Sequence, residues 1–314
     1  MKSRSRIATS TAAVTALLLT FGLTYPEWSS DTPLYESHVE ASTIVEDQPE
    51  TPAPPAPKPV QYVSFKLDGK QSIAQLKSRL GEEGFLTVLK INRVDPANLR
   101  KGTELMVPAE GGDPLEFSPF PRSIEVVKDI PKLILVSRRV QAFGAYEDGK
   151  LVWWGPTSTG KKATQTPAGL FHTNWRAKVT RSTVNSNWVL PWTFNLDNFD
   201  GIAFHQYALP GYPASHGCVR LLESDAKWVY GWSDQWVLST PEKRLLANGT
   251  PVIIFDNYAF GQQPPWKQLS ADATAASVTI AEIQKQLDKH LPAIEARAHE
   301  REMVMATMAE AKAK

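Results

Sequence analysis

Cysteine is almost absent from this chain of 314 residues, which contains only Cys218. A single cysteine excludes a framework of intramolecular disulfides. Excess charge is also absent, because 34 Lys and Arg residues balance 33 Asp and Glu residues. This balance argues against a nucleic-acid-binding protein, which needs a basic surface. Hydrophobic residues make up 42 % of the chain and include ten tryptophans, so the composition predicts a folded protein with a real core.

Long apolar runs are also scarce, and the main one, IATSTAAVTALLLTFGL, occupies residues 7–23. Basic residues precede it, as is typical of an export signal. The run is slightly shorter than the ~20 residues that span a bilayer comfortably. For residues 1–25 both a cleaved signal peptide and a retained inner-membrane anchor therefore remain open. Export predicts a location in the periplasm or cell envelope, where an unpaired cysteine indicates a thiol kept for its reactivity.

Residues 26–59 differ in composition from the rest of the chain. Residues 27–59 include seven acidic residues and a single Lys, and the segment ends in PETPAPPAPKP. Repeated prolines favour an extended polyproline II conformation, at ~3.1 Å per residue. We therefore expect an acidic, proline-rich linker that holds folded domains away from a membrane or simply adds solubility.

A small α+β domain is predicted over residues 60–110. A strand at 60–67 precedes a helix from Ser72 to about Gly81, a second helix over 85–91 and a strand at 104–107. The stretch LKINRVDPANLRKGTELMVP resembles the second half of a LysM module. That resemblance implies binding to the N-acetylglucosamine chains of bacterial walls. The alternative is a structural spacer domain without a sugar site.

Residues 122–258 have the pattern of a mainly β domain. Apolar or alternating runs occupy 133–137, 140–146, 151–155, 201–205 and 251–256, separated by turn signals. One helix is expected from Ser224 to about Trp236. Many short strands with one main helix predict a β sandwich or barrel-like fold.

The last segment, residues 270–314, is predicted to form a helical tail. Apolar residues recur at helical spacing through Ile280, Ile283, Leu287, Leu291 and Ile294. Pro292 lies in this pattern and predicts a kink. The apolar face either packs back onto the preceding domain or contacts another molecule.

Cys218 stands in the motif SHGCVR at residues 215–220, thirteen residues after His205. A thiol attacks carbonyl carbons only as the thiolate, so a base must take its proton. His216 is close in sequence, while His205 ends the strand-like run GIAFH. The turn-forming sequences LPG and YP between them would fold His205 back toward Cys218. The sequence thus places two possible bases near one nucleophile.

The residues around the cysteine suggest how a reacting carbonyl is held. Gly217 leaves room beside the backbone, and its amide and that of Cys218, with His216, would form an oxyanion site. Arg220 would stabilise the thiolate, orient a carboxylate or hold the loop by hydrogen bonds. Two other readings remain open at this point: zinc ligation by His205, His216 and Cys218, or an inert buried cysteine.

A resemblance to a known family bears on this choice. His205 and the SHGCVR motif resemble the signature of the L,D-transpeptidase catalytic domain of the YkuD type, as do STG at 158–160, TPAG at 166–169 and PW at 191–192. The resemblance implies a mostly β fold with a cysteine acyl enzyme and no metal or organic cofactor. Cys218 would be the nucleophile and His205 the base, its imidazole oriented by the carbonyl of the next residue. The residues implied to shape the site or bind substrate are Ser215, His216, Gly217, Arg220, Trp192, Gln206 and Tyr207.

The family reaction is a cross-linking of peptidoglycan. The resemblance implies that the thiol attacks a meso-diaminopimelate carbonyl, that D-alanine leaves, and that a stem-peptide amine resolves the thioester as a 3→3 cross-link. Water as acceptor would give an L,D-carboxypeptidase, and a protein lysine a lipoprotein-attachment enzyme. A wall-binding protein with a silent catalytic domain and a papain-like peptidase are further alternatives, the latter disfavoured by the strand pattern. The expected partners are peptidoglycan stem peptides and glycan strands, with no nucleic acid.

Overall fold

The computed structural model describes residues 60–313, which belong to one compact unit. The predicted export segment and the acidic linker, residues 1–59, lie outside the described residues. Within residues 60–313 no helix is both long and apolar enough to cross a bilayer.

The first part of the described chain is a small strand–helix–helix–strand module, residues 60–110. Strands β1 (Tyr62–Lys66) and β2 (Glu104–Pro108) pair antiparallel, and α1 (Lys70–Asn92) lies between them in sequence. Helix α1 has two halves, because Gly81 adopts a non-helical conformation with φ 70° and ψ 177°. A positive φ is accessible to glycine at little cost, so the break falls where the sequence predicts the first helix to end. The short 3-10 helix η1 (Pro96–Asn98) precedes β2.

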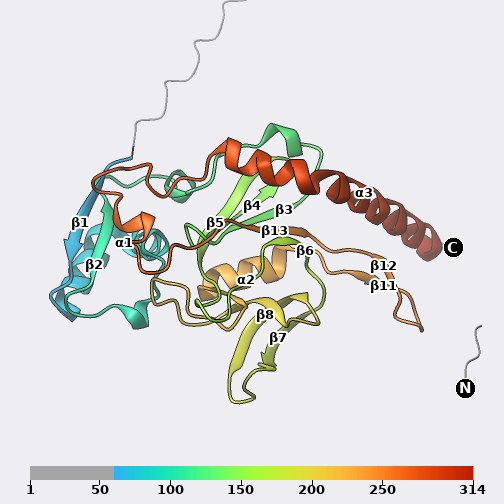
Figure 1. Cartoon of the computed structure of the whole chain (residues 1–314), viewed down its shortest axis with the longest axis horizontal. Helices are drawn as coiled ribbons and strands as arrows, with labels where there is room; N and C mark the ends of the chain where they lie inside the picture. Colours follow the sequence, from blue (N-terminus) through green and yellow to red (C-terminus); the bar gives the residue numbers. More distant parts are fainter. Residues whose placement is uncertain (1–59, 314) are drawn as a thin grey trace, which may run out of the picture. The chain divides into compact units, whose positions relative to one another are not determined.

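The main part is a single curled sheet of nine strands, ordered β6-β13-β3-β4-β5-β10-β9-β8-β7 (Figure 1). The strands are β3 (Leu133–Ser137), β4 (Ala142–Glu147), β5 (Lys150–Ser158), β6 (Gly169–His172), β7 (Arg176–Arg181), β8 (Val189–Asp197), β9 (Ile202–Gln206), β10 (Val219–Leu221) and β13 (Pro251–Phe255). Two pairs, β13 with β3 and β10 with β9, are parallel and the others antiparallel. The mainly β prediction is confirmed.

The central strands are buried on both faces, which explains their continuous apolar sequences. In β3, Leu133 and Leu135 belong to one hydrophobic cluster, while Ile134 and Val136 belong to the cluster on the opposite face. Because side chains alternate along a strand, a run such as LILVS is expected only where both faces are covered.

Helices cover the two faces. Helix α2 (Glu223–Trp232) packs with the cluster that contains Ile134, and α3 (Ile280–Ala313) packs with the cluster that contains Leu133. Helix α2 ends four residues before the predicted Trp236, because the N–H of that residue bonds to the Asn174 carbonyl at 3.2 Å. A tertiary contact thus replaces the last predicted turn.

The predicted C-terminal helix is present as α3, but it begins at Ile280, and residues 270–279 of the predicted helical tail form turns instead. Ile283, Leu287 and Ile294 are buried in the main core, so the first half packs back onto the sheet, one of the two predicted arrangements. Pro292 lies inside this helix. Its second half carries the exposed side chains of Met303, Met305 and Met308.

The strand–helix–helix–strand module is anchored to the sheet through buried charges. The Lys90 ammonium lies 3.0 Å from Asp225 Oδ1, with the two side chains 6 % and 0 % exposed, and donates to the Trp154 carbonyl at 2.9 Å. Arg93 donates from Nε to the Val140 carbonyl at 2.9 Å. Because a buried charge is costly unless it is paired, these contacts fix the module in one position on the sheet.

Candidate active site

His205 and Cys218 are brought together by the parallel pairing of β9 and β10. His205 lies opposite Arg220 and Phe204 opposite Val219, so Cys218 immediately precedes the strand that runs beside the histidine. The turn sequences between them do fold the chain back, as expected from LPG and YP.

Both residues line one open cavity of about 270 Å³. Its other walls come from the β7–β8 hairpin and from the segments around β9 and β10. Of the predicted site residues, the ones on this wall are Cys218, His205, Ser215, His216, Arg220 and Tyr207. Residues at the wall that the sequence analysis did not identify include Trp175, Arg181 and Trp188.

The His205 imidazole is buried and oriented by its own strand. Its side chain is 3 % exposed, and Nδ1 lies 3.0 Å from the Gln206 carbonyl oxygen. With Nδ1–H as the donor to that carbonyl, Nε2 is left with its lone pair. Burial lowers the pKa of His205 to about 4. The hydrogen bond to the Gln206 carbonyl acts in the opposite direction, and the charge of Arg220 lowers this pKa further. The ring is therefore neutral near pH 7 and able to accept a proton.

Cys218 is held as a thiol in the resting site. Its Sγ lies 3.2 Å from the Gly201 carbonyl oxygen, to which it donates. Burial raises the pKa of Cys218, while a hydrogen bond from the Ala203 backbone and the charge of Arg220 act in the opposite direction. A thiol that lines a cavity and is protonated at rest needs a base to become a nucleophile.

Ser215 organises the loop before the cysteine. The Gly217 N–H donates to Ser215 Oγ at 3.1 Å, and Ser215 Oγ donates to the Cys218 carbonyl at 2.5 Å. Gly217 has φ 127°, a conformation that disfavours side chains. The Gly217 amide, which the sequence analysis expects in an oxyanion site, thus donates to Ser215 Oγ in this structure, and its role in holding an oxyanion stays a prediction.

His216 lies between two side chains that the sequence analysis missed. Its Nε2 is 2.9 Å from the Lys161 ammonium, and its ring is 4.9 Å from that of Trp188. Its pKa is lowered by desolvation first, then by the charges of Lys161 and Arg220. The only sequence signal for Lys161 is its position directly after the STG segment. His216 is thus kept neutral beside a cation.

Trp192 lies away from the cavity. Its ring packs edge-on against Tyr230 at 5.4 Å and under the Lys227 ammonium at 5.5 Å, on the side of α2. Trp192 has φ 53°, so the side chains of β8 do not alternate regularly between the two faces of the sheet at this position. The Trp192 side chain is therefore turned away from the face that regular alternation would give it. Trp188, four residues before Trp192 in the sequence, lines the cavity instead.

Arg220 and Tyr207 form the rim next to His205. The Arg220 guanidinium lies 4.7 Å over the Tyr207 ring and donates to the Ala208 carbonyl at 3.3 Å. The Tyr207 ring stands edge-on to that of His205 at 5.9 Å. Of the three roles considered for Arg220, holding the loop by a hydrogen bond is the one with an observed contact. Gln206 contributes its carbonyl to His205, as described above.

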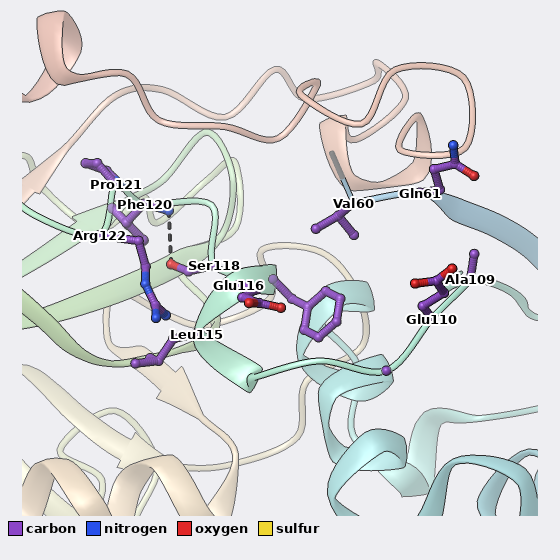
Figure 2. Close-up of a pocket in the computed structure, with 12 residues that line it drawn as sticks. Val60, Gln61, Ala109, Glu110, Leu115, Glu116, Ser118, Phe120, Pro121 and Arg122 are labelled. Atoms are coloured by element: carbon purple, nitrogen blue, oxygen red, sulfur yellow. Dashed lines mark hydrogen bonds between the residues drawn. The ribbon is translucent and has the colours of Figure 1, made fainter. Parts of the chain in front are cut away.

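Two other features of residues 60–313 bear on where a site could lie. Within residues 60–313 no three His, Cys, Asp or Glu side chains converge as a metal site would require, so His205, His216 and Cys218 are not arranged as zinc ligands. A larger cavity, about 850 Å³, lies among Val60, Glu110, Leu115 and Arg122. Figure 2 shows it, with the Phe120 N–H donating to Ser118 Oγ. Its walls include neither cysteine nor histidine, whereas the candidate nucleophile Cys218 and the candidate base His205 line the smaller cavity.

Buried histidines make the stability of the fold depend on pH. Burial lowers the pKa of both His172 and His205 to about 4, and Arg297 adds to the effect at His172. An unfolded histidine titrates near 6.5, so between about pH 6.5 and 4 the unfolded chain binds more protons and stability is lost as the pH falls. From pH 7 to pH 5 each histidine should remove roughly 2 kcal/mol.

Urea unfolding at the two pH values, for wild type and His172→Gln, measures this loss. Carboxyl groups titrate alike in both proteins, so the difference between the two pH dependences isolates His172. We expect the variant to lose less stability than wild type on acidification. Identical pH dependences would contradict a neutral, buried imidazole at position 172.

Comparisons with known proteins agree with the location of this site. A family model described as the L,D-transpeptidase catalytic domain (YkuD) matches residues 131–254, and does not extend to the module at 60–110. A search of curated proteins finds no relative that matches this chain.

Solved structures similar to this chain include three bacterial L,D-transpeptidases. The one from Xylanimonas cellulosilytica is 22 % identical, covers 65 % of this chain and 100 % of its own, and has a TM-score of 0.37. The one from Stackebrandtia nassauensis is 20 % identical, covers 60 % of this chain and 78 % of its own, and has a TM-score of 0.35. The one from Mycobacterium smegmatis is 19 % identical, covers 40 % of this chain and 59 % of its own, and has a TM-score of 0.32. This chain therefore spans less than two thirds of that protein. Residues 131–254 are thus similar to the L,D-transpeptidase catalytic domain, and this match covers less than half of the chain.

Proposed function

We propose that this chain is a peptidoglycan L,D-transpeptidase that works through a thioester on Cys218. The observation that carries the proposal is the pairing of β9 with β10, which puts a neutral, oriented His205 and the only thiol of the chain in one cavity. A base and a nucleophile on adjacent segments, with the base fixed by a third group, form the arrangement that nucleophilic catalysis requires.

The reaction follows from the protonation states. His205 Nε2 accepts the thiol proton as Cys218 Sγ attacks the carbonyl of a meso-diaminopimelate residue that precedes a terminal D-alanine. The C–N bond to D-alanine breaks, and the amine leaves with the proton from His205, which gives a thioester. An amine of a neighbouring stem peptide then attacks the thioester and yields its proton to the thiolate through His205, which forms a 3→3 cross-link and restores the thiol.

The charges at the cavity suit a substrate rich in carboxylates. Arg181 and Arg220 line the cavity, and Lys161 lies 2.9 Å from His216 at its edge. Stem peptides carry free carboxylates next to the bond that reacts, and paired cations orient such groups. The rings of Trp188 and Tyr207 would form apolar walls on either side of the peptide.

The remaining parts of the chain would serve to bring the catalytic domain to its substrate. Residues 7–23 would direct export, so that the enzyme works in the periplasm or cell envelope. The module at 60–110 would bind glycan strands as LysM modules do, which raises the local concentration of stem peptides without adding chemistry.

Product analysis with purified tetrapeptide stems tests the function. We expect mass spectrometry to detect 3→3 dimers and released D-alanine. The matched control is the same protein alkylated on its thiol, a selective treatment because Cys218 is the only cysteine. Tripeptide without dimer would indicate an L,D-carboxypeptidase, and adducts formed only with an added lysine-bearing peptide would indicate lipoprotein attachment. A folded, unmodified sample that releases no D-alanine would overturn the proposal.

A further inference from the structure

We propose that Asp95, in the module at residues 60–110, is a positioning residue for the active site. It holds the loop 207–214, which connects the base His205 to the SHGCVR motif. This inference rests on the function proposed above. It assigns the module a role in the catalytic step in addition to any role in binding.

The contact between Asp95 and the loop is reciprocal. The Asp95 N–H donates to the Leu209 carbonyl at 3.0 Å, and the Leu209 N–H donates to Asp95 Oδ2 at 2.7 Å. The next residues continue it, since Val94 forms an antiparallel bridge with Pro210. Leu209 itself is fully buried. A charge-assisted hydrogen bond to a buried amide is among the stronger contacts that a carboxylate makes.

Asp95 is itself fixed on the module. Its second oxygen, Oδ1, accepts from the Asn98 N–H at 3.0 Å and so caps the helix η1. Two residues earlier, Arg93 is 2 % exposed, and its side chain donates to the carbonyl of Val140, which lies between β3 and β4. The carboxylate therefore lies at a fixed point of the module, which is itself held by Lys90 to Asp225 of α2 and to the Trp154 carbonyl of β5.

Within residues 60–313, the hydrogen bonds of the loop other than those to residues 94 and 95 are made with the catalytic domain, and at its start the Tyr207 N–H donates to the Leu221 carbonyl at 3.3 Å. Arg220 donates to the Ala208 carbonyl, and Ser158 Oγ donates to the Tyr212 carbonyl at 2.8 Å and accepts from the Ala214 N–H at 3.1 Å. Asp95 holds Leu209, between these points. A shift of Leu209 would move Ala208, to which Arg220 is bound, and Gln206, whose carbonyl orients His205. Misplacing a catalytic group by about 1 Å can cost on the order of a hundredfold in rate.

The test separates positioning from stability by the choice of side chain. Asp95→Ser keeps a good helix cap for η1 but removes the oxygen that binds Leu209. Asp68→Ala is the matched control, because Asp68 lies on the same module, exposed and paired only with Lys101 at the surface. Both variants and wild type are acylated with a carbapenem, and the rate at saturation is separated from the half-saturating concentration. Hydrogen exchange of the Leu209 amide and the thermal midpoint are followed in parallel.

We expect Asp95→Ser to lower the saturating acylation rate by about 10- to 100-fold, with little change in the half-saturating concentration. Its Leu209 amide should lose protection while the thermal midpoint stays close to that of Asp68→Ala. Wild-type acylation by the variant despite an unprotected Leu209 amide would overturn the inference, as would an equal loss in Asp68→Ala. An absence of acylation in wild type would contradict the proposed function, and the exchange measurement would still show whether Asp95 holds the loop.

Discussion

Replacing Cys218 by serine should abolish acylation and cross-linking, with a loss of at least about a thousandfold in rate. Serine preserves the size of the side chain, but its hydroxyl is far less acidic than a thiol. His205, with a pKa lowered to about 4, is too weak a base to activate it. Intact-mass spectrometry after incubation with a carbapenem, together with the yield of 3→3 dimers, measures both steps.

A second variant distinguishes the nucleophile from the base. His205→Gln leaves the thiol in place and removes only the proton acceptor, a change that typically costs about 10²- to 10⁴-fold. We expect slow but detectable acylation on Cys218 in this variant, and none at all in Cys218→Ala. An adduct on another residue in Cys218→Ser would show that the nucleophile has been assigned incorrectly.

The largest effect on stability is expected from the buried pair Lys90–Asp225. Breaking a buried ion pair by removing one partner costs about 3–5 kcal/mol, because the other charge is left uncompensated. Asp225 is fully buried, and burial raises its pKa while Lys90 and the Trp153 N–H act in the opposite direction. Lys90→Met should therefore lower the free energy of unfolding by about 3–5 kcal/mol, as measured by urea denaturation.

Two further variants make this result specific. The double variant Lys90→Met with Asp225→Asn removes both charges. It keeps an oxygen acceptor for the Trp153 indole N–H, which donates to Asp225 Oδ1 at 3.0 Å. We therefore expect the double variant to recover most of the free energy of unfolding that Lys90→Met loses. Lys227→Met breaks the exposed pair with Glu223 on α2 and should cost only about 0.5 kcal/mol or less. A loss in Lys90→Met as small as that of Lys227→Met would contradict a buried, charged contact between the module and helix α2.

If Asp95 positions the loop 207–214 as proposed above, the stability of this pair also bears on the active site, because Asp95 belongs to the same module and binds Leu209. If Lys90 and Asp225 hold the module in place, Lys90→Met should also weaken the protection of the Leu209 amide. The two contacts lie on the same module, one at α1 and one directly before η1. Docking of the module and order in the loop are thus expected to be lost together.

The sequence patterns that were confirmed are local ones. The apolar runs at 133–137 and 251–256 predicted strands, and the glycine at 81 predicted the end of a helical segment. The apolar positions of α3 predicted a packed face, and Ile283, Leu287 and Ile294 are buried. Each of these signals lies within a few residues, because backbone geometry and side-chain periodicity are decided there.

Predictions that depended on tertiary contacts were less successful. The sequence predicted Trp192 as a substrate-binding residue, but Trp188 lines the cavity instead, because the positive φ of Trp192 breaks the alternation of β8. Lys161 and His216 are 55 residues apart in sequence, and nothing near either one indicates their contact. Helix α2 was predicted too long because Trp236 bonds to Asn174 instead.

The sequence by itself determined which residues are candidates for the chemistry: one thiol in SHGCVR and a histidine at the end of a strand before it, together with the strands and helices that carry them. Only the tertiary structure decided how that chemistry is held. Asp95 binds Leu209 across 114 residues and Lys90 reaches Asp225 across 135. Such pairs leave no local pattern, because their energy depends on burial and distance that arise only when the chain has folded.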